Sequence, residues 1–419
     1  MSSQPLAPPV RTTLGAVTTT IASVMPVFLL GGLAVQAGAE LGFSPAGLGG
    51  AVAIYFGVSA LTSVPAGALV ERFGAAVTAR LAIVLSAACL LAIATAGSYP
   101  VLVAVLAAGA AANGLGQLSS NAALNRVPPG RQGLSFGIKQ SAIPTATLLA
   151  GASVPAVALT LGWRWAFGIA AAAALAALAL VPPDGRRLGR ATATGTPPAR
   201  RTGGQPEIRS RPERATRALV VIGLAVALAS ASAGSLGTFL VDSAVTRGLA
   251  PGTAGLVLTL GSVVCVSARI TGGWLADRLG AHGDVAAVAG LLAVGSVGLA
   301  LLAVDGTVAL AVGVLLGFGF GWAFPGLVNV AVVQLHPHEP AAATSITQTG
   351  VYAGGCAGPL AFGAVAAGPG YPTAWLGAAA AMLLAAGLIL LGRQQLHRHL
   401  RPGRLPAAGQ PGPAGPGPA

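Results

Sequence analysis

Charged residues are scarce in this sequence. Lys and Arg contribute 23 of the 419 residues and Asp and Glu only 10, so charged residues make up 8% of the chain, against about 25% in an ordinary soluble domain. So few charges cannot cover the surface of a soluble fold of this size. An apolar content of 54% also argues against fibrous and disordered classes. The sequence therefore predicts a polytopic membrane protein.

Cysteine is also rare, and motifs of enzymatic chemistry are missing. Cys89, Cys265 and Cys356 each lie in a long apolar run and suggest no disulfide or metal framework. The sequence contains no nucleophile elbow, glycine-rich phosphate loop or nucleotide motif. The run from His336 to Glu339 offers too few ligands for a metal, and Pro337 would break a helix presenting them. We therefore expect no enzyme, no metal and no cofactor.

Twelve apolar stretches are long enough to cross a membrane as helices, which takes roughly 20 residues. They are residues 14–38, 45–69, 77–98, 100–124, 133–160, 165–182, 218–242, 252–275, 284–303, 307–333, 342–366 and 372–392. The first stretch is too long for the core of a signal peptide, so we expect it to be retained. The pattern predicts an all-α integral membrane fold of twelve transmembrane helices.

Arginines are distributed unevenly between the two sides of these spans. With the N-terminus in the cytoplasm, nineteen arginines lie on the cytoplasmic side, and only Arg164 and Arg247 lie outside. This is the positive-inside pattern, and it predicts that both termini are cytoplasmic. The net charge of +13 is then a topology signal, and we expect no nucleic-acid partner. A composition rich in Ala and Arg with a single lysine suggests a GC-rich bacterial genome, and hence the bacterial plasma (inner) membrane.

Five segments follow from the spans and from the composition between them. A stretch rich in Pro, Gly, Thr and Arg cannot bury a core and separates two sets of six spans. The predicted segments are a cytoplasmic N-terminus (1–13), an N-terminal six-helix bundle (14–182), a cytoplasmic linker (183–217), a C-terminal six-helix bundle (218–392) and a disordered cytoplasmic tail (393–419).

The two halves resemble each other at a nearly fixed spacing. At an offset of 206 residues the matching pairs include Gly42 with Gly248 and Pro45 with Pro251. At an offset of 208 they include Asn121 with Asn329 and Gln140 with Gln348. Two similar bundles can rock against each other about a site at their interface, which is the architecture of a carrier.

One eight-residue motif occurs in both halves. Residues 273–280 read Gly-Trp-Leu-Ala-Asp-Arg-Leu-Gly, and residues 67–74 read Gly-Ala-Leu-Val-Glu-Arg-Phe-Gly. The first resembles the G-x-L-a-D-R-x-G loop of the major facilitator superfamily, and the second is its weaker copy. Both follow the second span of their half, where that family places them. The resemblance covers residues 14 to 392 and implies a transporter of two pseudo-repeated six-helix bundles.

The loop motif supplies the candidate gating residues. Glycine allows close helix approach and a tight turn, an acid can cap a neighbouring helix N-terminus, and an arginine can bind helix C-terminal carbonyls. The resemblance implies that Glu71 and Asp277 latch the cytoplasmic side. A turn that carries positive-inside charge is the alternative for Arg72 and Arg278. The gating set is Gly67, Glu71, Arg72, Gly74, Gly273, Asp277, Arg278 and Gly280.

Two cations lie inside predicted spans, where an ionisable residue costs about 3 kcal/mol or more. Lys139 is the only lysine of the chain, and Arg269 lies eight residues before Asp277. In the family the spans that carry them are neighbours across the two halves. The acids all lie in loops except Asp242, which lies at a span end. An anionic substrate would supply the missing counter-charge, and snorkelling to the cytoplasmic interface is the alternative.

Neutral amides are the remaining polar groups of the spans. They donate and accept hydrogen bonds, which suits either a polar solute or a bond between helices. The substrate-binding candidates are therefore Arg269, Lys139, Asn113, Gln117, Asn121, Gln140, Asn329 and Gln348.

These features predict a secondary active or facilitative transporter that works by alternating access on a small anionic solute. The pattern G-x-x-x-G-P, which the family's drug–proton exporters carry in span five, is missing there. Drug or metabolite efflux, a neutral sugar or nucleoside carrier of the same fold, and a membrane sensor without flux remain the alternatives. The expected partners are a small-molecule substrate and the lipid bilayer, with protons as a candidate coupling ion, and we expect a monomer.

Overall fold

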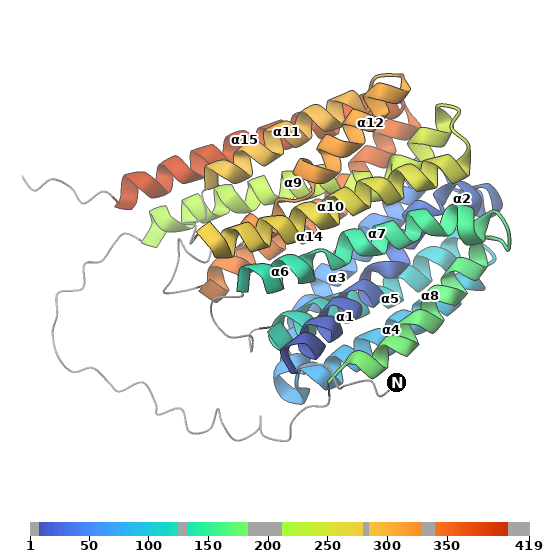
Figure 1. The fold of residues 1–419 in the computed structure, drawn as a ribbon, viewed down its shortest axis with the longest axis horizontal. Helices are drawn as coiled ribbons and strands as arrows, with labels where there is room; N and C mark the ends of the chain where they lie inside the picture. The colour runs from blue at the N-terminus through green and yellow to red at the C-terminus, as the bar shows by residue number, and fades with distance from the viewer. Residues whose placement is uncertain (1–7, 125–131, 183–211, 280–284, 329–339, 401–419) are drawn as a thin grey trace, which may run out of the picture.

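The structure is a computed structural model that describes residues 8–124, 132–182, 212–279, 285–328 and 340–400 (Figure 1). Almost all of the described residues are helical. The first half contains α1 (Pro8–Gly32), α2 (Ala34–Leu41), α3 (Pro45–Phe73), α4 (Ala75–Ala94), α5 (Tyr99–Leu124), α6 (Gln132–Gln140), α7 (Ala142–Ser153), the π-helix η1 (Val154–Ala158), α8 (Trp163–Ala177) and the 3-10 helix η2 (Leu178–Leu180). The second half contains α9 (Pro212–Thr246), α10 (Pro251–Leu279), α11 (Val285–Leu301), α12 (Thr307–Leu316), the π-helix η3 (Gly317–Gly321), α14 (Pro340–Ala367) and α15 (Tyr371–Leu400).

The described helices agree with the predicted spans. Eleven of them are long and apolar enough to cross a membrane, and Ala286–Leu301 is an apolar helix of shorter length. The predicted span 133–160 is divided into α6, α7 and η1. α1 begins before the first predicted span, at Pro8, and the separate helix α2 follows it to Leu41, so that Glu40 is helical and not in a loop.

At three further places a helix extends past a predicted boundary. α9 begins at Pro212, inside the predicted linker, because proline suits the first turn of a helix. α15 continues to Leu400, inside the predicted tail, because Arg, Gln and Leu are good helix formers. α9 also continues to Thr246, which places Asp242 inside the helix rather than at the span end. Residues 1–7, 183–211 and 401–419 lie outside the described residues.

The two halves pack as similar bundles side by side (Figure 1). In the first, α1 contacts α7 and α4 contacts α8; in the second, α9 contacts α14 and α11 contacts α15. The halves are joined by contacts of α3 with α14, of α10 with α6 and α7, and of α1 with α9. The sequence repeat also reappears in the backbone, since Gly42 and Gly248 both end a helix at a positive φ, of 71° and 88°. Only glycine adopts this conformation without strain.

Small residues allow the halves to approach at one end of the bundle, which we call the α2 end. A Cβ on Gly49 of α3 would overlap the Pro359 carbonyl of α14. A Cβ on Gly151 of α7 would lie 2.6 Å from the Gly255 carbonyl of α10. Close helix contacts through glycine are typical of membrane interiors, where packing replaces the hydrophobic effect. These contacts close the interface between the halves at the α2 end.

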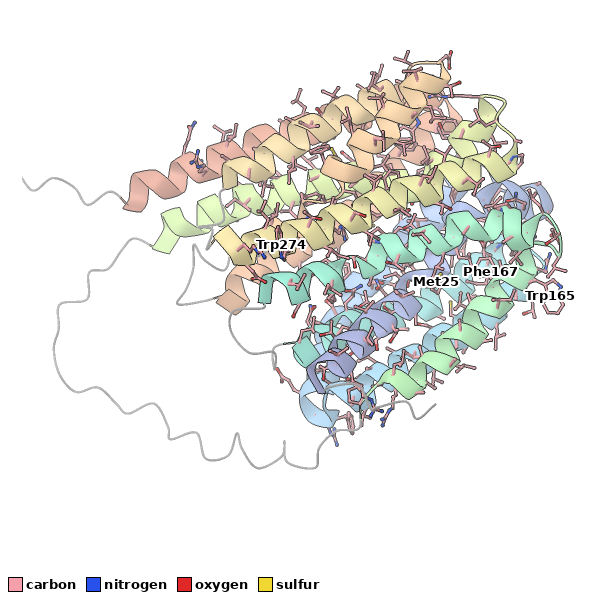
Figure 2. All side chains as sticks on the ribbon, viewed as in Figure 1. Met25, Trp165, Phe167 and Trp274 are labelled. Carbon is pink, nitrogen blue, oxygen red and sulfur yellow. The ribbon has the colours of Figure 1, made fainter. Side chains whose placement is uncertain are left out.

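Exposed tryptophans mark both ends of the bundle. Trp165 is 61% exposed and lies at the α2 end, whereas Trp274 is 41% exposed and lies toward the opposite end (Figure 2). Tryptophan is enriched at the two membrane–water interfaces. The two positions therefore suit a bundle that spans a bilayer along its helix axes.

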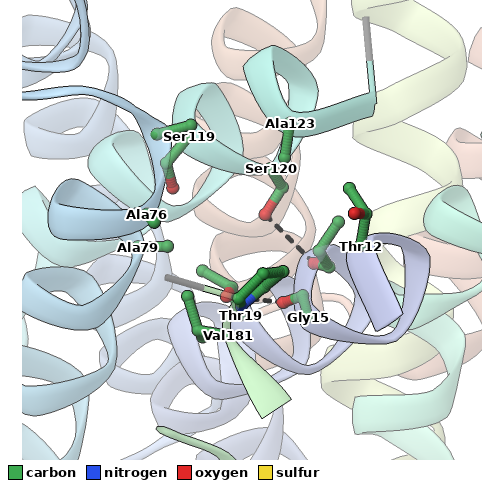
Figure 3. A pocket seen from close by; sticks show the side chains of 12 residues that line it. Thr12, Gly15, Thr19, Ala76, Ala79, Ser119, Ser120, Ala123 and Val181 are labelled. Carbon is green, nitrogen blue, oxygen red and sulfur yellow. Dashed lines mark hydrogen bonds between the residues drawn. The ribbon is translucent and has the colours of Figure 1, made fainter. Parts of the chain in front are cut away.

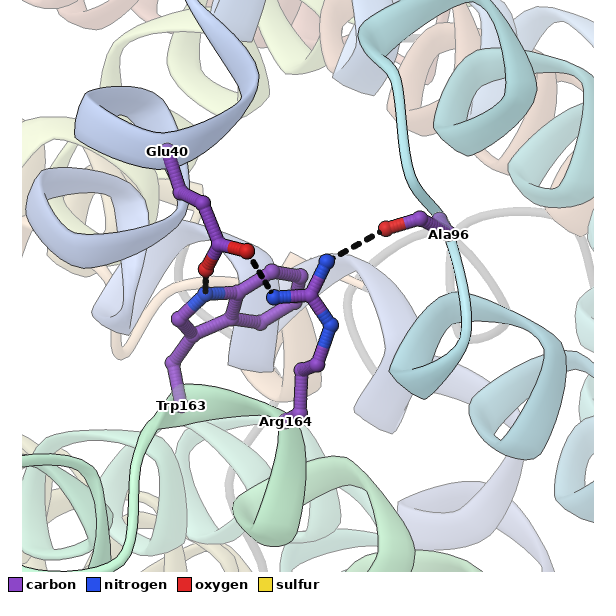
Figure 4. A network of polar contacts seen from close by, with 4 residues as sticks. All are labelled: Glu40, Ala96, Trp163 and Arg164. Atoms are coloured by element: carbon purple, nitrogen blue, oxygen red, sulfur yellow. Dashed lines mark hydrogen bonds and ion pairs between the residues drawn. The ribbon is translucent and has the colours of Figure 1, made fainter.

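A polar brace holds the first half together at the α2 end (Figure 4). Glu40 of α2 forms an ion pair with Arg164 of α8 and accepts a hydrogen bond of 2.6 Å from the Trp163 indole N–H. Arg164 also donates to the Ala96 carbonyl, just after the end of α4, at 2.7 Å. The hydrogen bond from Arg164, followed by that from Trp163, lowers the pKa of Glu40 from its ordinary value.

The second half repeats this brace with other residues. At the offset of 208, Tyr371 takes the place of Trp163, and Val304 takes the place of Ala96. The Tyr371 hydroxyl donates to Asp242 of α9, and Arg247 donates to the Val304 carbonyl at 3.1 Å. An arginine thus caps the end of the third span in each half, which favours the helix dipole there. Each bundle is tied to itself, and none of these contacts joins the two halves.

Candidate functional site

Arg269 lies at the interface between the halves. It belongs to α10, its side chain is 4% exposed, and it donates to two backbone carbonyls. The Nε and Nη2 atoms bind the Trp322 carbonyl at 3.0 and 2.6 Å. The Nη1 atom donates to the Gln140 carbonyl of the first half. One guanidinium therefore bridges the two bundles, which makes use of its fork of five N–H donors.

Pro144 explains why the Gln140 carbonyl is available. In an unbroken helix this carbonyl would accept a hydrogen bond from the residue four positions later, which is Pro144 and has no N–H. The helix is interrupted at Ser141, between α6 and α7. Freed carbonyls in a membrane helix are normally satisfied by a neighbouring helix. Here the neighbour is α10, through Arg269.

Lys139 is the second buried cation of this region. Its side chain is 2% exposed and its Nζ atom donates to Gln117 Oε1 of α5 at 2.7 Å. Lys139 and Arg269 are close enough to repel each other electrostatically. Among the described residues, no carboxylate lies within ion-pair distance of either cation. The helices that carry the two cations, α6 and α10, are in contact across the halves.

The Trp322 ring lies beside the guanidinium of Arg269 and packs against two further aromatic rings. The Trp322 ring lies 5.9 Å from the Arg269 guanidinium carbon and 5.9 Å from the Phe28 ring of α1. Phe318, in the π-helix η3, lies 5.5 Å from the same indole. π-Helical turns are frequent at functional sites. Cations, amide and aromatic rings thus meet where α1, α5, α6, α10 and η3 converge.

The other predicted amides are dispersed. Asn113 is 1% exposed and donates to Ser59 Oγ at 3.1 Å, but its Oδ1 has no partner among the described residues. Gln140 contributes its backbone carbonyl to Arg269. Gln348 is half-buried on α14. Asn121 is half-buried on α5, and Asn329 lies outside the described residues. Sequence reasoning missed Pro144, although its spacing of four from Gln140 was a usable signal.

The loop motif of the second half contacts the first half. Asp277 Oδ2 accepts a hydrogen bond of 2.8 Å from the backbone N–H of Leu134, in the first turn of α6. Gly273 lies against Gly137 of α6, where a Cβ would meet the Gly273 Cα at 3.3 Å. A carboxylate at a helix N-terminus satisfies a free donor and favours the helix dipole.

The remaining loop residues make fewer contacts. Arg278 lies over the Trp274 ring at 4.3 Å, and Arg72 lies over the Phe73 ring at 5.2 Å. Gly74 has a φ of 83° between α3 and α4. Glu71 is exposed. A Cβ added to Gly67 would lie 4.0 Å from the Leu118 side chain, so this glycine has space around it. Gly280 and the run from His336 to Glu339 lie outside the described residues.

Two cavities lie within the first bundle, away from the cations. One, of about 190 Å³, is lined by α1, α4, α5 and residues 181–182. Its hydroxyls are bonded to their surroundings: Ser120 donates to the Ala16 carbonyl at 3.0 Å and Thr19 donates to the Gly15 carbonyl at 2.7 Å (Figure 3). The other, of about 260 Å³, lies between α1, α7 and α8. Neither cavity is lined by Lys139 or Arg269, and both cations are buried.

A family comparison identifies this architecture. The model described as Major Facilitator Superfamily matches residues 13–359 and, in an overlapping match, residues 224–414. The chain belongs to the Major Facilitator Superfamily. It is therefore a multi-pass membrane protein of a transporter family, and the predicted family and twelve-helix fold are confirmed.

Solved structures of other transporters share the fold. A bacterial homologue of the human lysosomal transporter Spinster, inward-facing and unoccupied, has a TM-score of 0.71 at 16% identity, over 94% of this chain and 99% of that chain. A D-xylose–proton symporter has a TM-score of 0.70 at 17% identity, over 91% and 96%. The human organic anion transporter MFSD10 (TETRAN) has a TM-score of 0.63 at 19% identity, over 93% and 100%. A search of curated proteins finds no match to this sequence. At these identities the likeness shows the fold alone.

Proposed function

We propose that this superfamily member is an alternating-access carrier for a small anionic solute, with Arg269 and Lys139 as the substrate-binding cations. The observation that carries the proposal is the pair of buried cations that repel each other. Among the described residues, neither cation has a carboxylate as an ion-pair partner. Buried charges are stable when they are paired. An anion placed between the two would remove their repulsion and form charge-assisted hydrogen bonds with both.

The position of the cations also suits a carrier. Arg269 joins α10 of the second half to Gln140 of the first half, so it lies where rocking of the bundles would separate the groups. A substrate anion competes with the two carbonyls for the guanidinium. Binding would therefore exchange a contact between the halves for a contact with substrate, which couples substrate binding to the conformational equilibrium.

The loop motif provides the gate in this proposal. The Asp277 carboxylate caps α6 across the interface, and this contact would stabilise the state in which the end opposite α2 is closed. Glu71 has the equivalent role in the other half. By the positive-inside rule this end is cytoplasmic and both termini lie in the cytoplasm. We place the protein in the bacterial inner membrane, where reporter fusions at both termini test the orientation.

Ligand-induced thermal stabilisation tests the proposal. The purified protein is heated with a panel of inorganic and organic anions, neutral sugars and nucleosides, and cationic drugs, because a ligand that binds only the folded state raises the melting temperature. Arg269→Met and Lys139→Met are measured beside Arg11→Met, which removes an exposed cation of α1. We expect an anion to stabilise the wild type and Arg11→Met, and to lose its effect in both interface variants.

The other outcomes separate the competing functions. A shift produced by a sugar, nucleoside or drug and retained in both interface variants would refute the anion proposal. An anion that stabilises the protein but is not taken up or exchanged by proteoliposomes would indicate a sensor without flux. The same proteoliposomes, with and without a pH gradient, decide whether transport is proton-coupled.

A further inference from the structure

We infer that the first bundle binds an anionic phospholipid of the surrounding membrane, with one acyl chain in a groove between α1, α7 and α8. The groove has a volume of about 260 Å³ and lies entirely within the described residues. It is lined mainly by apolar side chains, and Met25 from α1 is one of them (Figure 2). The site lies away from the interface between the halves and is independent of the substrate proposed above.

Alanines on α8 create the groove. Ala166, Ala170, Ala173 and Ala177 lie along one side of it, where their short side chains leave space that larger residues would fill. Ile169 of α8 and Leu149 of α7 flank this space and are 49% and 45% exposed. In a membrane-spanning bundle an exposed apolar flank faces hydrocarbon. The groove therefore opens toward the acyl chains of the bilayer.

The polar groups of the groove require no polar ligand. Thr18 Oγ1 donates to the Leu14 carbonyl at 2.9 Å, and Ser153 Oγ donates to the Ala150 carbonyl at 2.7 Å. Both hydroxyls are thus satisfied within their own helices, as is usual for Ser and Thr in membrane helices. The lining positions on α1 run from Thr18 to Leu29, about 16 Å at the helical rise of 1.5 Å per residue. This length matches one leaflet of a hydrocarbon core about 30 Å thick.

Two arginines bind backbone carbonyls just beyond the end of α8, the helix that carries the lining alanines. Arg11 Nη2 donates to the Ala179 carbonyl at 3.4 Å, and Ala179 follows the lining residue Ala177 by two positions. Arg80 of α4 donates to the Val181 carbonyl at 3.3 Å, also at the end of this helix. No carboxylate in the described part of the chain forms an ion pair with either arginine. Each guanidinium keeps further N–H donors that can bind a phosphate.

The apolar groove and the two arginines together indicate which class of ligand would bind. A groove for one acyl chain, beside a helix end that holds two arginines, complements a molecule with an apolar tail and an anionic head. Anionic membrane lipids are attracted to arginine at the membrane surface, whereas a zwitterionic lipid gains only the apolar contact. Phosphatidylglycerol is the probe we choose for this chemistry, and phosphatidylcholine with the same acyl chains is its comparison.

Native mass spectrometry of the full-length protein, titrated with each lipid, tests the inference. For the wild type we expect tighter binding of phosphatidylglycerol, by roughly 5-fold for each arginine that contacts the headgroup. Arg11→Gln combined with Arg80→Gln should abolish the preference and leave the remaining binding equal for the two lipids. Arg11→Lys combined with Arg80→Lys should keep most of it, because the charge is retained.

A matched pair of substitutions tests the groove itself. Ala173 lines the groove, whereas the adjacent Ala172 does not, and both are exposed on α8. Ala173→Phe should fill the groove and weaken binding of both lipids at least 10-fold, while Ala172→Phe should leave it unchanged. Equal effects of the two substitutions, or equal affinity of the wild type for the two lipids, would overturn the inference. So would a protein dimer that Ala173→Phe dissociates, because a second copy would then occupy the groove.

Discussion

The hydrogen bond from Arg269 to the Gln140 carbonyl offers a direct test of the interface between the halves, because Pro144 is the reason that this carbonyl lacks a partner in its own helix. Pro144 removes the N–H that would otherwise bind the Gln140 carbonyl, and Arg269 supplies the replacement. Pro144→Ala restores a backbone N–H at that position. The carbonyl then has a partner inside its own helix, and the stability of the protein should depend less on Arg269.

The expected magnitude follows from one interhelical hydrogen bond and one carbonyl that would otherwise be left unsatisfied. Side-chain hydrogen bonds between membrane helices contribute on average about 0.6 kcal/mol and at most about 1.7 kcal/mol. A buried acceptor that loses its partner costs about 1–3 kcal/mol. We therefore expect Arg269→Met to cost about 1–2 kcal/mol less in the Pro144→Ala background than in the wild type. The bonds to the Trp322 carbonyl are lost in both backgrounds and cancel.

A double-mutant cycle measures this difference. The free energy of unfolding in mixed detergent micelles is determined for the wild type, both single variants and the double variant. Pro65→Ala, at a proline inside α3, is the control and should be additive with Arg269→Met. Additivity of Pro144→Ala and Arg269→Met within about 0.5 kcal/mol would refute the argument, because residues that share a partner are expected to couple.

Three further predictions concern the two ends of the bundle. The lowered pKa of Glu40 means that its charge stabilises the fold above the ordinary glutamate value of 4.5, and this contribution should be lost as the pH falls through the lower folded-state value; a Glu40→Gln variant whose melting temperature falls as steeply with acid as that of the wild type would contradict this. Asp277→Asn should increase the reactivity of a cysteine placed at Leu134 toward a water-soluble thiol reagent, since the neutral amide caps α6 more weakly; labelling as slow as in the protein that keeps Asp277 would argue against this gating contact. Gly49→Val should separate α3 from α14 at the α2 end, because the Pro359 carbonyl occupies the position of its Cβ; cysteine crosslinking between these helices should decrease at that end, while Gly50→Val, which has more space, should leave it intact.

The comparison of sequence and structure is clearest in the span that contains Lys139. The apolar stretch 133–160 was correctly predicted to cross the membrane, because its length and composition suffice for that inference. Its interruption at Ser141 and its π-helical turn at Val154–Ala158 were not predicted. A proline in the sequence shows which backbone hydrogen bond is lost. Whether the helix then bends or breaks, and whether the free carbonyl gains another donor, depends on the neighbouring helix.

The sequence reveals the repeat of the two halves, but it does not reveal which side chains make equivalent contacts in them. Offsets of 206 and 208 residues aligned Gly42 with Gly248 and Gln140 with Gln348. In the braces at the α2 end, the aromatic residues Trp163 and Tyr371 correspond at the offset of 208, and each donates a hydrogen bond to an acid, but the acids Glu40 and Asp242 correspond at neither offset. The residue types differ because either aromatic residue can donate a hydrogen bond from an apolar ring. A comparison by residue identity alone therefore misses this equivalence.

The sequence by itself determined the environment, the helices and the family of this protein. The scarcity of charge, the length of the apolar stretches and the duplicated loop motif are local properties, and a bilayer leaves a chain of this composition few other folds. The tertiary structure decided which polar groups meet. Arg269 lies 129 positions from Gln140 and 53 from Trp322 along the chain, and Asp277 lies 143 positions from Leu134. Contacts at such separations depend on how the two bundles pack, since only packing brings one guanidinium to the carbonyls that a proline and a helix end have left free.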